Sequence, residues 1–231
     1  MSHASLVAAW LLATAPAVVA AADDYSIVTQ RVSEPGDAGE VLVFVGEQIS
    51  YELLDLSCDD CWVFDTWHTA RYRVTEAIHG VRPGEELEFN VAEHAILVPF
   101  GHTSYALAFV ERHDNHLALV KYQQVPVYPT QDLSFASCGP LDGASVDPGE
   151  PLNPKYPELR DIDFSPRLVV DDTRRMSALG RQKAYDPRWH EVEGDEIVCS
   201  RGIPLAELVA AKVRGHEVLE AALPEFAGAG R

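Results

Sequence analysis

The sequence predicts a mainly β (α+β) protein, in which an antiparallel β body is followed by a proline-rich strap and a C-terminal helix. Two observations carry this prediction. Between residues 41 and 123, apolar and polar side chains alternate with a period of two, in stretches separated by short turns. After residue 138 the alternation stops, prolines become frequent, and a helical apolar period follows near the end. Strands that alternate in this way are typical of antiparallel sheets.

Three strands are expected in the first half of this body. Val41–Leu53 begins as a continuous apolar run and becomes polar after Gly46. Thr69–Ile78 alternates cleanly, with residues 70, 72 and 74 apolar or aromatic and their neighbours polar. Glu86–Val91 repeats the pattern, and "HGVRPGE" between the two is a turn because Gly and Pro interrupt regular structure.

The last two expected strands form a hairpin. "SYALAFVE" and "HLALVKYQ" flank the polar "RHDN", which is the pattern of two paired strands joined by a short loop. We therefore expect His113 and His116 to be polar residues at the hairpin tip rather than metal ligands.

The C-terminal part has a different texture. Six prolines within residues 139–166 exclude regular structure and predict a linker or an extended strap over the body. "LVVDDTRRMSALGRQ" (168–182) predicts a short helix. "IPLAELVAAKVRGHEVLEAAL" (203–223) predicts a stronger helix with Pro204 near its start and an interruption at Gly215. Its apolar stripe comprises Leu205, Leu208, Val209 and Val213.

The N-terminus has the features of an export signal. Residues 1–22 contain no Lys, Arg, Asp or Glu, and the apolar run "LVAAWLLATAPAVVA" ends in small residues before Asp23. A membrane anchor is the alternative, but Pro16 breaks the apolar run and no basic stop-transfer cluster follows. We expect signal cleavage, an extracytoplasmic location (periplasmic or secreted) and no membrane insertion afterwards.

These patterns divide the chain into four parts. Residues 1–22 are the expected signal peptide and residues 23–138 the β domain. Residues 139–166 are the strap, and residues 167–231 a helical appendage packed on the β domain.

The charge balance limits the partners. The chain has 18 basic and 36 acidic residues, a formal net charge of −18. Such a surface repels phosphate backbones and anionic lipids, so we expect no nucleic-acid partner. A basic protein partner is compatible with the charge; improved solubility is the alternative explanation.

Four cysteines in an exported chain predict up to two disulfides. Three pairings exist, and the simplest joins Cys58 to Cys61 and Cys138 to Cys199. On the chain-entropy model, closing the short loop contributes only about 2 kcal/mol and closing the long one roughly 4 kcal/mol.

The C-x-x-C pair Cys58 and Cys61 is compatible with a structural staple, a redox centre or a metal site. Asp59 and Asp60 disfavour a thiolate, and no helix start lies nearby, so the staple is favoured over the redox role. A metal site could use both thiols and His68, but the paired ligand spacing of zinc sites is missing. We therefore expect no cofactor.

Trp62, Phe64 and Trp67 follow the cysteine pair. On an exposed loop they would form a partner-binding patch, because Trp is enriched among interface anchors. In the core they would cap one end of the β body, which is favoured because large aromatic side chains are mostly buried.

No catalytic motif was found in the sequence. The G-x-S-x-G elbow, the H-E-x-x-H helix and the phosphate-cradling glycine loop are all missing from it. We do not expect an enzyme and name no catalytic residue, although a dispersed active site would leave no such pattern.

Three segments together resemble a known family. "VFVGEQ", "ARYRVTEAIHGVRPGEELEF" and "YALAFVE" occur in the order found in the netrin-type module of the tissue inhibitors of metalloproteinases and its bacterial relatives, over roughly residues 40–140. The resemblance implies a five-stranded antiparallel OB-like barrel used for protein binding and sometimes for protease inhibition. Those inhibitors begin with a cysteine that contacts the metal of the protease, whereas Asp23–Tyr25 provides none. The cysteines also depart from the eukaryotic pattern, so only the barrel is carried over.

Three functions follow as hypotheses. The first is an exported, disulfide-stabilised OB-type module that binds a protein, as an inhibitor or protective protein for a basic extracytoplasmic enzyme. The second is a thiol-redox or metal-binding protein that uses Cys58 and Cys61. The third is a structural envelope protein without chemistry.

Overall fold

The computed structural model describes residues 39–54, 65–93, 103–141, 150–153, 157–172, 177, 180 and 185–228. All of the described residues belong to one compact unit, Ala38–Arg231, and the expected signal peptide lies outside them.

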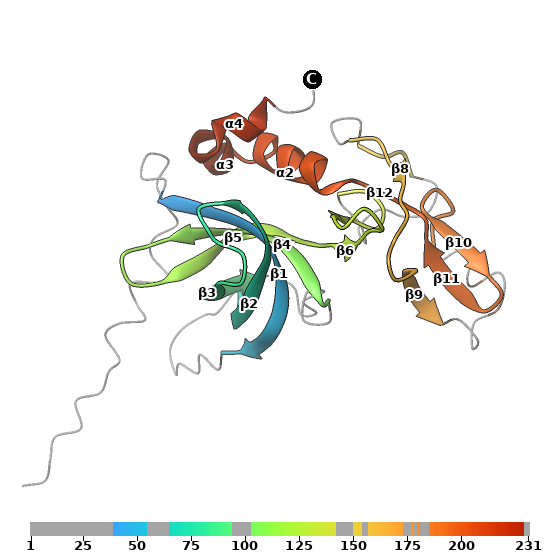
Figure 1. The fold of residues 1–231 in the computed structure, drawn as a ribbon, viewed down its shortest axis with the longest axis horizontal. Helices are drawn as coiled ribbons and strands as arrows, with labels where there is room; N and C mark the ends of the chain where they lie inside the picture. The colour runs from blue at the N-terminus through green and yellow to red at the C-terminus, as the bar shows by residue number, and fades with distance from the viewer. Residues whose placement is uncertain are drawn as a thin grey trace, which may run out of the picture. The chain divides into compact units, whose positions relative to one another are not determined.

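Five strands close into a barrel, as predicted (Figure 1). They are β1 (Glu40–Leu53), β2 (Thr66–His79), β3 (Glu86–Glu93), β4 (Tyr105–Arg112) and β5 (Leu117–Pro126). The order around the barrel is β1-β2-β3-β5-β4, with β4 paired to β1. The fold is therefore a mainly β, OB-like barrel.

One pair of strands differs from the predicted antiparallel arrangement. β3 and β5 run parallel, with Asn90 opposite Ala118, whereas the other four neighbouring pairs are antiparallel. The reason is topological, because an odd number of strands cannot alternate in direction all the way around a closed ring. The five expected strands thus imply a parallel contact as soon as the barrel closes.

β1 is buried on both faces along its apolar run, since alternate side chains of a strand point to opposite sides. Leu42 and Phe44 point into the barrel, and Val41, Val43 and Val45 pack on its outer side. At Gly46 a β-carbon would lie 2.9 Å from both Phe44 and Tyr72, which explains the glycine where the strand becomes polar.

β2 and β3 follow the predicted alternation. Residues 70, 72 and 74 are buried, and residues 71, 73 and 75 are exposed. The connection contains Gly80 and Gly84, both with positive φ (71° and 81°). This backbone conformation favours glycine, as the turn prediction required.

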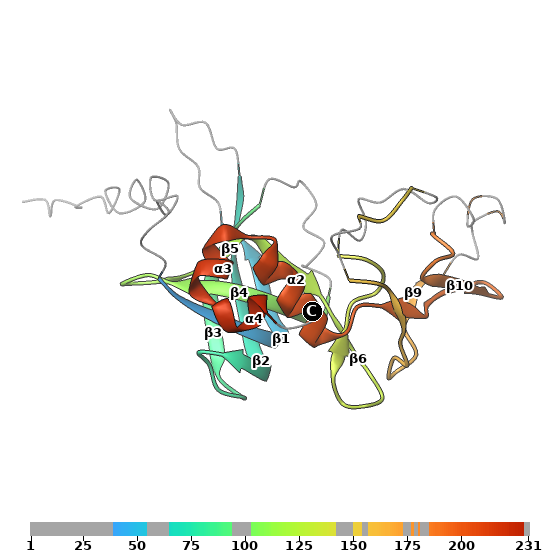
Figure 2. The ribbon, with the colours of Figure 1, turned by 90° about the horizontal axis from the view of Figure 1, so that it is seen from above.

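The C-terminal helices cover the outer side of the barrel (Figures 1 and 2). They are α2 (Leu205–Arg214), α3 (Glu217–Ala222) and α4 (Pro224–Ala227). The predicted stripe of α2 is buried, and it packs with outward-facing residues of β1, β4 and β5. Gly215 ends α2, as predicted.

Short strands form much of the chain between β5 and α2 in sequence. They are β6 (Tyr128–Pro129), β7 (Phe135–Ala136), β8 (Arg160–Asp161), β9 (Val169–Asp172), β10 (His190–Glu193), β11 (Glu196–Cys199) and β12 (Arg201–Gly202). They form the sheets β6-β7, β12-β8 and β10-β11-β9.

The helix predicted over residues 168–182 is wrong at its start. Val169–Asp172 is the strand β9 and pairs antiparallel with β11. Val169 and Val170 are β-branched, which favours a strand once a partner strand is available. The appendage predicted as helical over 167–231 therefore also contributes a three-stranded sheet, and the described helices α2, α3 and α4 lie in its last part.

The expectation that residues 139–166 contain no regular structure is also wrong, because Arg160–Asp161 between the prolines pairs with β12 as the strand β8. The strap also contributes the buried Leu159 and Phe164.

The predicted disulfide between Cys138 and Cys199 is present, with the Cα atoms 5.9 Å apart. It links the end of the β domain to β11.

Candidate functional site

A hydrogen-bonded chain of polar side chains crosses the inside of the barrel. The amide of Gln124 on β5 donates to the Tyr72 hydroxyl on β2 (2.9 Å), and that hydroxyl donates to Gln48 Oε1 on β1 (3.1 Å). Tyr72 is fully buried and Gln124 is 3% exposed. The barrel places these side chains together because all three point inward from strands far apart in sequence.

Burial raises the pKa of Tyr72 to about 12, an effect only partly offset by the hydrogen bond from Gln124. The hydroxyl therefore stays protonated at neutral pH and acts as a donor toward Gln48. The Oε1 atom of Gln124 is buried without a hydrogen-bond partner. These hydrogen bonds between Gln124, Tyr72 and Gln48 orient the three side chains, and the group offers neither an ionised nucleophile nor a base.

His68 lies at the end of the inward face of β2. Its ring packs against Tyr51 of β1 with 4.8 Å between centroids, and its Nδ1 atom is buried without a partner. Burial lowers the pKa of His68, which favours the neutral ring. Trp67, next in sequence, is half-buried, and its carbonyl accepts a hydrogen bond from Leu54 N.

An ion pair ties the start of β2 to β5. Lys121 Nζ lies 2.9 Å and 3.1 Å from the two carboxylate oxygens of Asp65, and this hydrogen bond is the main reason why the pKa of Lys121 is raised. Tyr122, which follows, has a φ of 62° and is 48% exposed. Lys121 also lies over its ring, 5.3 Å from the centroid.

A second polar cluster surrounds the disulfide. His190 Nε2 lies 3.6 Å from Cys138 Sγ, and burial lowers the pKa of His190. Asp186 pairs with Arg188, whose guanidinium lies 5.2 Å from the ring centroid of Trp189. Gly139 packs on that ring, where a β-carbon would come within 2.7 Å of the indole nitrogen.

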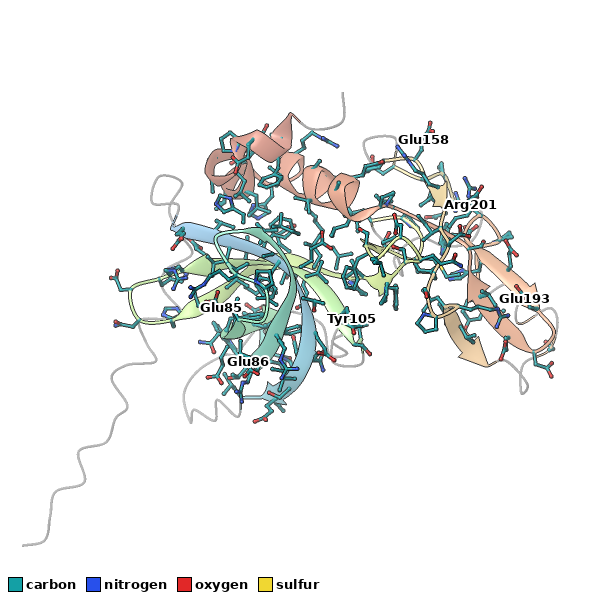
Figure 3. All side chains as sticks on the ribbon, viewed as in Figure 1. Glu85, Glu86, Tyr105, Glu158, Glu193 and Arg201 are labelled. Atoms are coloured by element: carbon teal, nitrogen blue, oxygen red, sulfur yellow. A yellow bond between two sulfur atoms is a disulfide. The ribbon has the colours of Figure 1, made fainter. Side chains whose placement is uncertain are left out.

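Arg201 connects this cluster to the strap (Figure 3). Its guanidinium donates to the carbonyl oxygens of Leu159 (2.9 Å) and Arg188 (3.2 Å). The cluster therefore joins the strap to β12 through directed polar contacts. Its groups are used in packing the appendage.

The outer surface carries several exposed large apolar side chains. They are Ile49, Leu53, Tyr122, Leu133, Val169 and Val192. Leu133, at 94%, is the most exposed of them, and its φ is 63°. Only Tyr122 and Leu133 combine a positive φ with a side chain other than glycine among the described residues.

The structure tests the predicted site residues only in part. Cys58, Cys61, Trp62 and Phe64 lie outside the described residues. Trp67 is half-buried and His68 is buried, so His68 contributes to the barrel core. Within the described ranges, no group of three or more His, Cys, Asp or Glu side chains could hold a metal ion. His113 and His116 stack at the tip of the β4–β5 hairpin with 4.8 Å between centroids, as the hairpin prediction implied.

Sequence reasoning missed Tyr122 and Leu133. Tyr122 lies at an irregularity of β5 that depends on its pairing with β4, so the local sequence does not mark it as exposed. For Leu133, the one local signal is its position after the turn-forming "TQD".

Comparison with known proteins adds no relative. No protein-family model matches the chain, and searches of curated proteins and of solved structures found no match. Among the described residues, no helix has both the length and the apolar character needed to cross a membrane.

Proposed function

We propose that the chain is an exported protein-binding module that uses the outer surface of its barrel and the attached β6–β7 hairpin to recognise a basic partner. The observation that carries the proposal is the filled interior of the barrel. Leu42, Phe44, Tyr72 and Phe89 are 2% exposed or less and pack against one another. A barrel whose interior is filled by side chains has its outer surface left for binding.

The side chains inside the barrel pack against one another across several strands. The Phe89 ring lies 5.6 Å from Tyr72 and 6.2 Å from Phe44, measured between centroids. These aromatic contacts bring together β1, β2 and β3, so a ligand inside the barrel would have to displace the core. Binding at the surface requires no such cost.

Charge supports a basic partner. The chain carries a net charge of −18, and complementary charge accelerates association and selects among partners. The sharper form of the proposal is an inhibitor or protective protein for a basic extracytoplasmic enzyme. The OB-like barrel resembles the netrin-type module, whose members bind proteins, and the N-terminal 22 residues support export.

The test is capture at two ionic strengths. The mature chain, immobilised, would be exposed to the extracytoplasmic fraction of its source cells at about 20 mM and about 300 mM NaCl, since screening weakens exposed charge pairs. We expect a cationic protein to bind at low salt and to be released at high salt. An unrelated protein of equal net charge is the control for simple ion exchange. The proposal would be contradicted if the same proteins were captured at both salt concentrations, or if the control protein captured the same partner.

A second candidate is a thiol-redox or metal-binding protein, and the C-x-x-C spacing of Cys58 and Cys61 favours it. Thiol titration of the mature protein at poised potentials separates it from the first. Structural disulfides resist reduction down to about −300 mV, whereas catalytic ones reduce nearer −200 mV. Reduction at the higher potential, or free thiols that hold a metal, would favour this second function.

A further inference from the structure

The hairpin between β6 and β7 has a well-defined turn. Thr130 N donates to the Ser134 carbonyl (3.0 Å), and Leu133 N donates to the Thr130 carbonyl (3.1 Å). The Thr130 hydroxyl also bonds the Asp132 carboxylate. Leu133 follows the tight turn in the left-handed conformation, with φ 63°. Glycine or asparagine normally occupies this position of a hairpin.

The strap supports the hairpin from the side. Gln131 N donates to the Asp163 carbonyl (2.8 Å), and Ser165 N donates to the Pro129 carbonyl (2.9 Å). Thr130 forms a β-bridge with the buried Phe164. The loop is therefore held on two sides, and Figure 2 shows it projecting from the edge of the body beyond β6.

The side chain of Leu133 contributes almost nothing to the stability of the fold. It is 94% exposed, so it buries almost no apolar surface, and the left-handed conformation is unfavourable for a leucine. Tyr122, the other non-glycine residue of positive φ in the described part of the chain, is likewise large and exposed. A strained backbone conformation whose energetic cost is not offset by burial of the side chain is characteristic of functional positions.

We infer that Leu133 is an apolar anchor that inserts into a pocket of the partner protein. The inference rests on the proposed function and assigns its contact point. Asp132 in the loop and Asp163 in the paired strap segment are both exposed. The pocket that fits this tip is apolar at its base and has Lys or Arg side chains at its rim, in agreement with the charge of the whole chain. Pre-organised loops of this kind bind with little loss of conformational entropy.

The test uses Leu133→Asn, because asparagine tolerates a positive φ and removes the apolar anchor. Val192→Thr is the matched control, since Val192 is also exposed (55%) but lies in the regular strand β10. The probe is the protein that the wild-type chain captures at low salt and releases at high salt, purified and measured by calorimetry. We expect Leu133→Asn to weaken binding at least about tenfold, the range of an interface anchor, while Val192→Thr binds like the wild type.

Thermal unfolding provides the second readout. Because strain is relieved, we expect the Tm of Leu133→Asn to be unchanged or to rise by about 2–4 °C. A purely structural leucine would instead lower the Tm. Equal binding by Leu133→Asn and the wild type would overturn this inference and leave the proposed function intact. A wild-type chain that captures no salt-sensitive partner would overturn both.

Discussion

The barrel and the segment that follows it are stabilised in different ways. In the barrel, each of the five strands pairs on both sides, and apolar side chains fill the interior. From residue 128 onward, the sheets within the described ranges have two or three strands and remain open. A small separate cluster there has Ala136, Phe164 and Cys199 as its buried members, while other buried residues of this segment, such as Leu159 and Ile203, join the core on the outer side of the barrel. A disulfide and hydrogen-bonded polar contacts supply stability that this small cluster does not.

This difference indicates where the chain can carry function. A closed barrel has no free strand edges and a core that tolerates little change, which suits a scaffold. The appended hairpins are held by hydrogen bonds and a disulfide rather than by a closed barrel, and they present side chains such as Leu133 to solvent. Binding residues are commonly found on loops that a rigid scaffold positions.

The largest expected effect is in the barrel core. Phe44→Ala removes a fully buried ring that contacts Phe89, and the closed ladder allows little collapse, so we expect a loss of about 3–5 kcal/mol. Chemical denaturation measures it. Val192→Ala, at an exposed site in the appendage, should change the free energy of unfolding by about 0.5 kcal/mol or less. Similar costs for the two variants would remove the contrast between scaffold and appendage.

Removing the disulfide tests how the segment after the barrel is stabilised. Cys138→Ala with Cys199→Ala opens a link across 61 residues, which the chain-entropy model values at about 4 kcal/mol. Hydrogen exchange should show faster exchange in β10 and β11 than in the barrel strands. If the barrel amides lose protection to the same extent, the two regions unfold as one and the comparison is wrong.

A smaller effect is expected for the polar chain inside the barrel. Tyr72→Phe removes the hydroxyl between Gln124 and Gln48 and leaves buried amide atoms without that partner, at a cost of about 1–3 kcal/mol. The double variant Tyr72→Phe, Gln124→Leu should cost less than the sum of its single variants, because the two residues share one interaction. If the losses in the free energy of unfolding of the two single variants simply add in the double variant, Tyr72 and Gln124 are not energetically coupled.

The smallest effect is a pH dependence in the appendage. Burial lowers the pKa of His190, so the unfolded chain binds a proton more readily than the folded one. Stability should therefore decrease as pH falls below the unfolded value of about 6.5. His190→Gln should lose part of the decrease in Tm between about pH 7.5 and pH 5.5.

Glu76, whose pKa burial raises, acts in the opposite sense. Its contribution is present in both the wild type and His190→Gln, so it cancels in their difference. An identical pH profile for the two proteins would rule out a contribution from His190.

Local sequence patterns determined most of the barrel and the final helix. The alternation at residues 70–74, the glycine turn before β3 and the interruption at Gly215 are properties of neighbouring residues, and the structure has each of them. These features depend on side-chain periodicity and on glycine's freedom of φ, both of which can be judged within a few residues.

Tertiary structure decided the rest. β9 is a strand because β11 is beside it, although its sequence is compatible with a helix. Closure of five strands made β3 and β5 parallel, and folding selected the pairing of Cys138 with Cys199. Leu133 became the exposed tip of a supported hairpin only when the strap packed beside Thr130. Each of these features depends on contacts between residues distant in sequence, whose free energy does not exist until the chain has folded.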